Sequence, residues 1–164
     1  MVMLMKKVIS GGQTGVDRAG LDAAMEVGFK VGGYCPRDRR AEDGRIPEIY
    51  PLQELEEREF HYRTEKNVIE SDGTLILNKG DLTEGTGLTY DYAVQHGKPV
   101  LIVQLDSEQL IAPSDVVRWI HGQQIITLNI AGPRESKFTE GIYRDAYEYL
   151  KRLCDALKNY RRGE

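Results

Sequence analysis

Short apolar runs recur along the chain, and longer polar stretches separate them. Five such runs stand out, at residues 7–10, 31–34, 74–77, 100–103 and 125–128. The later runs are apolar at consecutive positions rather than at every second one. That pattern is typical of strands that are covered on both faces, as in a parallel sheet. We therefore expect about five buried strands.

Between the runs, apolar residues recur at the spacing of amphipathic helices. Val16, Ala19, Ala23 and Val27 mark the first helix, which Gly28 is suited to end. Further helical patterns cover residues 62–70, 89–96, 116–121 and 143–160. Strands that alternate with helices in this way predict an α/β fold, with a doubly wound, mostly parallel sheet of about five or more strands and helices on both faces.

The length of 164 residues is that of one domain. We therefore expect residues 1–164 to form a single ligand-binding domain. One segment, at about residues 35–60, interrupts the alternation with three prolines and many charged residues. Long irregular insertions are often functional loops. The alternative is a solvated surface loop whose charges pair with one another, and the sequence leaves both open.

Composition narrows the classes of partner. The net charge of −4 argues against binding to duplex nucleic acid but leaves room for one small anionic ligand. No apolar run approaches the roughly 20 residues of a membrane span. Two cysteines without a CxxC motif and three distant histidines predict neither a disulfide framework nor a metal site. We therefore expect a cytoplasmic protein with reduced cysteines and with no nucleic-acid or membrane partner.

The most distinctive chemistry lies in Ser10–Gly20, which follows the first predicted strand and opens the first helix. In an open parallel sheet, ligands bind at the carboxyl ends of the strands. Glycines let the backbone approach a ligand closely, and a helix N-terminus attracts anions. The expected ligand-binding residues here are Gly11, Gly12, Gln13, Thr14, Gly15, Asp17 and Arg18. In the alternative interpretation, Thr14 and Asp17 only cap the helix.

Arg18 is the most suggestive side chain of this segment. It lies in the first turn of the predicted helix, where the helix dipole disfavours a cation. An anionic partner close to Arg18 would account for its position.

A second segment, residues 80–91, follows the third predicted strand and leads into another helix. Gly85 and Gly87 give a ligand access to the backbone, and the hydroxyl groups of Thr86 and Thr89 can bind an anion. Asp91 is expected to lie about one turn into this helix, within reach of a ligand hydroxyl. The alternative is a plain turn with a threonine cap.

A third segment, residues 131–137, follows the last predicted strand. Its Arg134, Ser136 and Lys137 suit the binding of phosphate groups. The alternative is an exposed loop whose charges partly cancel.

Five motifs in the same order resemble the "putative molybdenum carrier" family. They are ISGGQTGVDR at residues 9–18, YCP at 34–36, RRAEDG at 39–44, GTGLT at 85–89 and AGPRES at 131–136. That family belongs to a Rossmann-like group that also contains molybdenum cofactor carrier proteins and lysine-decarboxylase-like phosphoribohydrolases. The resemblance spans most of the chain. It implies a Rossmann-like fold, a nucleotide-like or pterin-phosphate-like ligand and a homo-oligomer.

The phosphoribohydrolases of this group carry the motif PGGxGTxxE, in which the glycines hold phosphate and the glutamate acts at the ribose. The corresponding stretch of this chain matches the motif at Gly85 and Gly87. Glu84 replaces a glycine, Leu88 replaces the threonine, and Asp91 stands in place of the glutamate. Because catalytic geometry tolerates little displacement, these departures weaken a hydrolase interpretation and leave ligand binding intact.

Three functions remain, and the first is the leading one. It is a cytoplasmic binder or carrier of a phosphorylated small ligand, molybdenum cofactor or a nucleotide, held by the two glycine-rich segments while Arg134 and Lys137 close the pocket. No dedicated protein-bound metal is predicted, and Cys35 is the only soft candidate for molybdenum. The second function is a phosphoribohydrolase that cleaves the N-glycosidic bond of a nucleoside monophosphate, with Asp91 as its catalytic residue. The third is a nucleotide-sensing regulatory module in which the insertion is the switch or partner surface.

Overall fold

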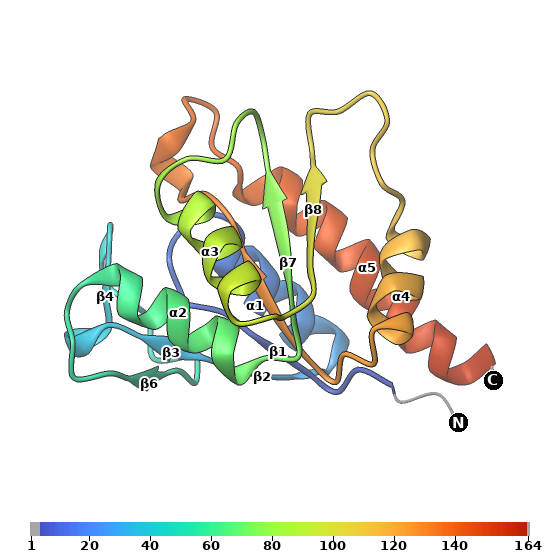
Figure 1. The fold of residues 1–164 in the computed structure, drawn as a ribbon, viewed down its shortest axis with the longest axis horizontal. Coiled ribbons are helices and arrows are strands. Elements are labelled where there is room, and N and C mark those ends of the chain that lie inside the picture. The colour runs from blue at the N-terminus through green and yellow to red at the C-terminus, as the bar shows by residue number, and fades with distance from the viewer. Residues whose placement is uncertain (1–3, 164) are drawn as a thin grey trace.

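A computed structural model describes residues 4–163 of the chain, with side chains as far as residue 160. Its main sheet has the strand order β2-β1-β9-β7-β8, and every neighbouring pair is parallel (Figure 1). These strands are β1 (Lys7–Ile9), β2 (Lys30–Gly32), β7 (Gly73–Asn78), β8 (Val100–Gln104) and β9 (Thr127–Ala131). The predicted α/β class with a doubly wound parallel sheet is therefore confirmed.

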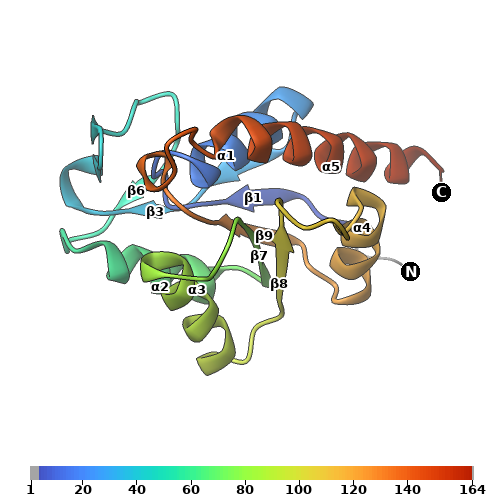
Figure 2. The same ribbon diagram turned by 90° about the horizontal axis from the view of Figure 1, so that it is seen from above.

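The helices of the described chain cover both faces of this sheet, also as predicted. They are α1 (Val16–Val27), α2 (Phe60–Glu70), α3 (Glu84–Gln95), α4 (Pro113–Gly122) and α5 (Tyr143–Gly163). Figure 2 shows α1 and α5 on one side and α2 and α3 on the other, and α4 packs against α5. No helix in the described residues is long and apolar enough to cross a membrane.

The main core lies between the sheet and the helices α1, α4 and α5. Leu75 and Leu77 of β7 are fully buried there, as are Ala19 of α1 and Leu150 of α5. Strands β7, β8 and β9 contribute alternate residues to this core, and α2 and α3 pack on the opposite side of these strands. Burial on both faces is the reason why β7 reads as an uninterrupted apolar run.

Three element boundaries differ from the sequence-based expectation. The predicted strand at 31–34 is interrupted at Gly33, whose φ of 128° turns the chain between β2 and the short β3 (Tyr34–Cys35). The last strand begins at Thr127 rather than at residue 125, because the chain is still turning out of α4 there: Gln124 has a φ of 56°, and Ile125 N–H donates to the Ile120 carbonyl. The third helix begins at Glu84 rather than at residue 89. Gly85 and Gly87 therefore lie inside the first turns of α3 and not in a loop before it.

The charged insertion is ordered, although it contains only short elements. These are η1 (Arg37–Arg39), β4 (Arg40–Ala41), β5 (Gly44–Arg45) and β6 (Gln53–Glu54), with β4 paired to β5 and β6 paired to β3. The buried Arg39 side chain organises the segment by donating hydrogen bonds to the carbonyl groups of Ile46, Pro47, Tyr50 and Leu52. One buried side chain thereby ties together four carbonyl groups of the loop, of which those of Pro47 and Tyr50 also accept backbone N–H groups.

Candidate functional site

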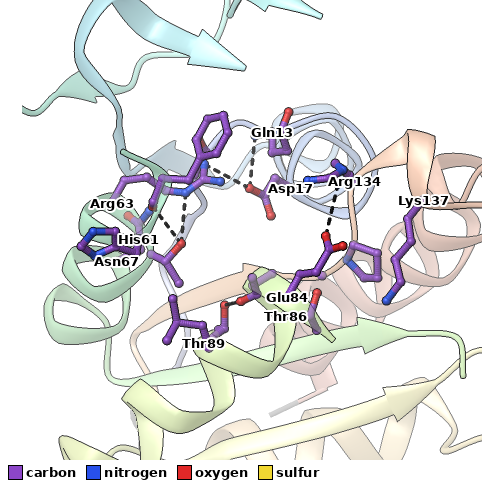
Figure 3. Close-up of a pocket in the computed structure, with 18 of the residues that line it drawn as sticks. Gln13, Asp17, His61, Arg63, Asn67, Glu84, Thr86, Thr89, Arg134 and Lys137 are labelled. Carbon is purple, nitrogen blue, oxygen red and sulfur yellow. Dashed lines mark hydrogen bonds and ion pairs between the residues drawn. The ribbon is translucent and has the colours of Figure 1, made fainter. Parts of the chain in front are cut away.

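A pocket of about 360 Å³ lies at the carboxyl edge of the main sheet. Its walls are the loop after β1, residues 60–67 of α2, the start of α3, and the end of β9 with the loop after it (Figure 3). From this edge the chain leaves β1 for one face of the sheet and β7 for the other. Open parallel sheets bind ligands in the crevice that such a divergence creates, and the volume is that of a small-molecule site.

The pocket brings together eight of the predicted ligand-binding residues, which come from all three predicted segments. They are Gly11, Gln13, Asp17, Gly85, Thr86, Thr89, Arg134 and Lys137. The others, Gly12, Thr14, Gly15, Arg18, Gly87 and Ser136, lie outside its lining. Asp91, the catalytic candidate of the hydrolase interpretation, is exposed on α3 and does not line the pocket either.

The backbone N–H groups of the first glycine-rich loop are largely engaged within the protein. Gly12 N–H donates to Ser10 Oγ at 3.2 Å, and Gln13 N–H donates to Asp17 Oδ2 at 3.1 Å. Thr14 N–H donates to the side-chain oxygen of Gln13 at 3.1 Å. Asp17 therefore occupies the position at the α1 N-terminus that a bound anion would take. In this structure the expected anion cradle is filled by the protein's own carboxylate.

Arg18 finds its anionic partner inside the chain. Its two terminal nitrogens lie 2.7 and 2.8 Å from the carboxylate of Asp43, and its Nε donates to the Gly12 carbonyl at 3.0 Å. Asp43 belongs to the tip of the β4–β5 hairpin. Arg18 thus fixes that hairpin to the first glycine-rich loop instead of facing a ligand.

Glu42, next to Asp43, holds the same hairpin tip against the rim of the pocket. Its carboxylate accepts hydrogen bonds from Thr14 Oγ1 and from the backbone and hydroxyl groups of Ser136, and it lies 3.5 Å from Arg134 Nε. Burial raises the pKa of Glu42, but the hydrogen bonds from Ser136 and Thr14 and the charge of Arg134 outweigh burial and lower the pKa overall. Thr14 and Ser136 therefore join the loops around the pocket rather than line it.

A buried ion pair forms the inner wall of the pocket. Arg63 of α2 and Asp17 of α1 are 8% and 6% exposed. Arg63 Nη1 lies 4.0 Å from Asp17 Oδ2 and donates to the Gly11 carbonyl at 3.1 Å. Burial raises the pKa of Asp17 to about 6. The charges of Arg63 and Arg18, and the N–H groups of Gln13 and Gly11, lower the pKa by a smaller amount. Strongly shifted pKa values of this kind are concentrated at functional sites.

The pH dependence of folding tests this description of Asp17. Because its pKa is about 6 when folded and ordinarily 3.8, the folded protein binds more protons than the unfolded chain between those values. The free energy of unfolding therefore falls as the pH rises from about 4 to about 6, by about 1.4 kcal/mol per unit of pKa difference. Asp17→Asn is expected to remove this fall in urea denaturation at a series of pH values, and Asp91→Asn to retain it. A fall that persists in Asp17→Asn would belong to another group.

Helix α2 supplies five pocket residues that the sequence interpretation missed. They are Phe60, His61, Arg63, Thr64 and Asn67. The Asn67 side chain exchanges two hydrogen bonds with the backbone of Tyr34, at 2.9 and 3.0 Å, and so docks α2 against β3. The available signal was the weak amphipathic pattern of residues 62–70, because this helix directs Arg63 and Asn67 inward together with Val68.

The opposite end of the pocket is cationic. Figure 3 shows Arg134 and Lys137 at this end, across from Arg63, His61 and Asn67, with Asp17 between the two groups. Arg134 Nη2 lies 3.2 Å from the carboxylate of Glu84, and Lys137 donates to Thr83 Oγ1. Glu84 has a φ of 50°, which is uncommon for a residue with a Cβ and recurs at functional sites.

The pocket offers no soft ligands for a molybdenum atom. Cys35 is buried with Ile46 and Tyr50 in a small apolar cluster outside the pocket, and burial raises the pKa of its thiol. Among residues 4–163, no group of three or more His, Cys, Asp or Glu is arranged to hold a metal ion. What this site offers a ligand is hydrogen bonding and charge, which suit an organic group and its phosphate.

Comparison with known proteins agrees with this architecture. Residues 8–154 match the model of the circularly permutated YpsA SLOG family. A crystal structure from Syntrophus aciditrophicus SB at 1.45 Å resolution, described as a "putative molybdenum carrier protein", superposes with a TM-score of 0.84. The two sequences are 43% identical, and the match covers 93% of this chain and 97% of that one. No curated protein matches the chain.

Proposed function

The chain belongs to the circularly permutated YpsA SLOG family, and from that premise we propose that its pocket binds a small phosphorylated ligand, either molybdenum cofactor or a nucleotide. The match to the family model and the similar crystal structure confirm the family resemblance that the sequence motifs indicated. One observation carries the proposal. Arg134 and Lys137 meet the first turn of α3 at one end of a pocket at the carboxyl edge of a parallel sheet.

The cationic end suits a phosphate group. Arg134 is 44% exposed and pairs with two partly exposed carboxylates, those of Glu42 and Glu84. Exposed ion pairs of this kind contribute little free energy, so a phosphate dianion can replace Glu84 at the guanidinium group. The positive end of the α3 dipole favours the same charge.

Binding accounts for the geometry better than N-glycosidic hydrolysis by Asp91. That reaction requires a carboxylate at the ribose, within hydrogen-bond reach of the reacting group. Asp91 is exposed outside the pocket, and so it cannot act on a ligand there. We therefore favour a binder or carrier over a phosphoribohydrolase.

Molybdenum cofactor would be carried through its organic part. The crystal structure described as a "putative molybdenum carrier protein" supports this cargo. Because Cys35 lies outside the pocket, the protein would hold the pterin and its phosphate and leave the metal without a thiolate from this chain. The family resemblance also supports a cytoplasmic homo-oligomer.

Removal of the cationic end tests the proposal. Arg134→Ala and Lys137→Ala are each expected to weaken binding of molybdopterin or of guanosine monophosphate (GMP) by about ten- to a hundredfold, because each removes a charge-assisted hydrogen bond. Isothermal titration calorimetry measures the change. Arg144→Ala, which removes an exposed arginine from α5, should bind like the wild type. The proposal fails if the wild type binds neither molybdopterin nor a nucleoside monophosphate.

A further inference from the structure

We propose that Asp17 and Arg63 together recognise the 2-amino-4-oxo edge of a fused pyrimidine ring, numbered as in the pyrimidine. Pterins and guanine share this hydrogen-bonding edge. This inference rests on the proposed function and names the ring that the phosphorylated ligand carries. It concerns the inner wall of the pocket, whereas the proposed phosphate position is at the cationic end.

Asp17 is a buried acceptor that the protein satisfies only in part. Figure 3 shows its carboxylate directed into the pocket, and the residue is 6% exposed. An ionised carboxylate has about four acceptor sites. The protein supplies the N–H groups of Gln13 and Gly11. A buried charge that lacks hydrogen bonds is costly, so the remaining sites call for donors from a ligand.

Arg63 provides a donor beside this acceptor. Its Nη1 is 4.0 Å from Asp17 Oδ2, which is too far for a hydrogen bond between them. Nε and Nη1 donate to Thr64 and Gly11, and Nη2 has no hydrogen-bond acceptor among residues 4–163. The guanidinium group lies 5.2 Å from the centre of the Phe60 ring, which restricts its orientation. The inner wall thus presents an acceptor and a donor side by side.

The 2-amino-4-oxo edge is complementary to that arrangement. Its ring N–H and exocyclic amino group are adjacent donors that match the two oxygens of one carboxylate. The neighbouring oxo group is an acceptor for Arg63. Adenine lacks both the ring N–H and the oxo group on this edge, and hypoxanthine lacks the amino group. The pterin of molybdenum cofactor and the base of a guanine nucleotide both carry this edge, so one binding arrangement fits both candidate ligands.

Two pairs of probes isolate the amino group. Pterin and lumazine differ by a 2-amino or a 2-oxo group, and GMP differs from inosine monophosphate (IMP) only by the amino group. At a pH of about 7, the wild type is expected to bind pterin about ten- to a hundredfold more tightly than lumazine, and GMP more tightly than IMP by the same factor. The reason is that lumazine and IMP lack the amino group that donates a hydrogen bond to the Asp17 carboxylate. Calorimetric titration measures the four affinities.

Asp17→Asn is the decisive variant. An asparagine amide accepts from the ring N–H and donates to a 2-oxo group, so the variant should prefer lumazine to pterin and lose the difference between GMP and IMP. A reversed preference cannot arise from misfolding. Asp91→Asn makes the same chemical change on the exposed face of α3 and should keep the wild-type preference.

The remaining outcomes separate this inference from the proposed function. If the wild type binds GMP, IMP and adenosine monophosphate equally, with Arg134→Ala weakening all three, the phosphate site stands and the ring assignment is overturned. If Asp17→Asn weakens every ligand to the same extent, Asp17 contacts a part common to all of them, such as the ribose, and the assignment is again overturned. If neither these probes nor molybdopterin binds, both proposals fail.

Discussion

Replacing Arg63 by methionine should lower the free energy of unfolding by about 3–5 kcal/mol at a pH of about 8. Methionine keeps much of the length of the side chain and removes its charge and donors. Asp17, 6% exposed, would then remain ionised without its nearest counter-charge, and the Gly11 carbonyl would lose its donor. Removing one partner of a buried ion pair has this cost because the remaining charge stays buried, without a counter-charge and without hydration. Chemical denaturation of both proteins measures the difference.

The pH dependence of the loss identifies its cause. Without Arg63, the pKa of Asp17 rises further, so at a pH of about 5 the carboxyl group is protonated and the loss should shrink. The double variant Arg63→Met with Asp17→Asn should recover much of the stability at a pH of about 8 as well. A loss of the same size at both pH values, with no recovery in the double variant, would show that packing rather than the stranded carboxylate is responsible.

The second large effect concerns Gly33, between β2 and β3. Gly33→Ala is expected to cost about 2–6 kcal/mol, the sum of about 1–3 kcal/mol for the unfavourable backbone conformation and about 1–3 kcal/mol for overpacking. Its φ is 128°, and a Cβ there would lie 2.1 Å from the carbonyl oxygen of Ser10. That oxygen belongs to the backbone at the start of the first glycine-rich loop, so it cannot move away cheaply. Thermal and urea denaturation of the variant measure the cost.

Two other glycines separate the causes of that loss. Gly28 has a φ of 94° but open space around a Cβ, so Gly28→Ala should show the cost of conformation alone. Gly122, the last residue of α4, has neither restriction, and Gly122→Ala should be neutral or stabilising by up to about 1 kcal/mol. Equal losses in Gly33→Ala and Gly28→Ala would mean that the close approach to Ser10 is unimportant.

The fold was predictable because its dominant signal is local. Strands such as β7 are covered on both faces and therefore appear in the sequence as continuous apolar runs. The break at Gly33 was not predictable from that signal, since apolar neighbours continue the run on both sides. The early start of α3 was not predicted either. Gly85 and Gly87 are poor helix formers, so the sequence around them reads as a glycine-rich loop before the helix.

The residues of the candidate site were predictable from the sequence only where they lie in the segments that directly follow strands. The rule that ligands bind at carboxyl ends selects Gly11, Gln13 and Arg134 from sequence order alone. It cannot select Arg63, which reaches the pocket from the side of a helix. Nor can spacing show that Arg18 is neutralised by Asp43, which is 25 residues away in the chain. Such pairings depend on how the insertion folds back over the first loop.

The position of β9 between β1 and β7 has a consequence for how the chain folds. β1 and β2 are joined through α1, and β7 and β8 through α3, so each pair brings together nearby parts of the chain. β9 pairs with both inner strands, and its contacts with β1 span about 120 residues. Pairing over such a distance is slow, and until it occurs β1 and β7 each present an open edge to other chains. During synthesis on the ribosome, the two halves can form early, but the sheet is joined and the pocket completed only when the last quarter of the chain has emerged.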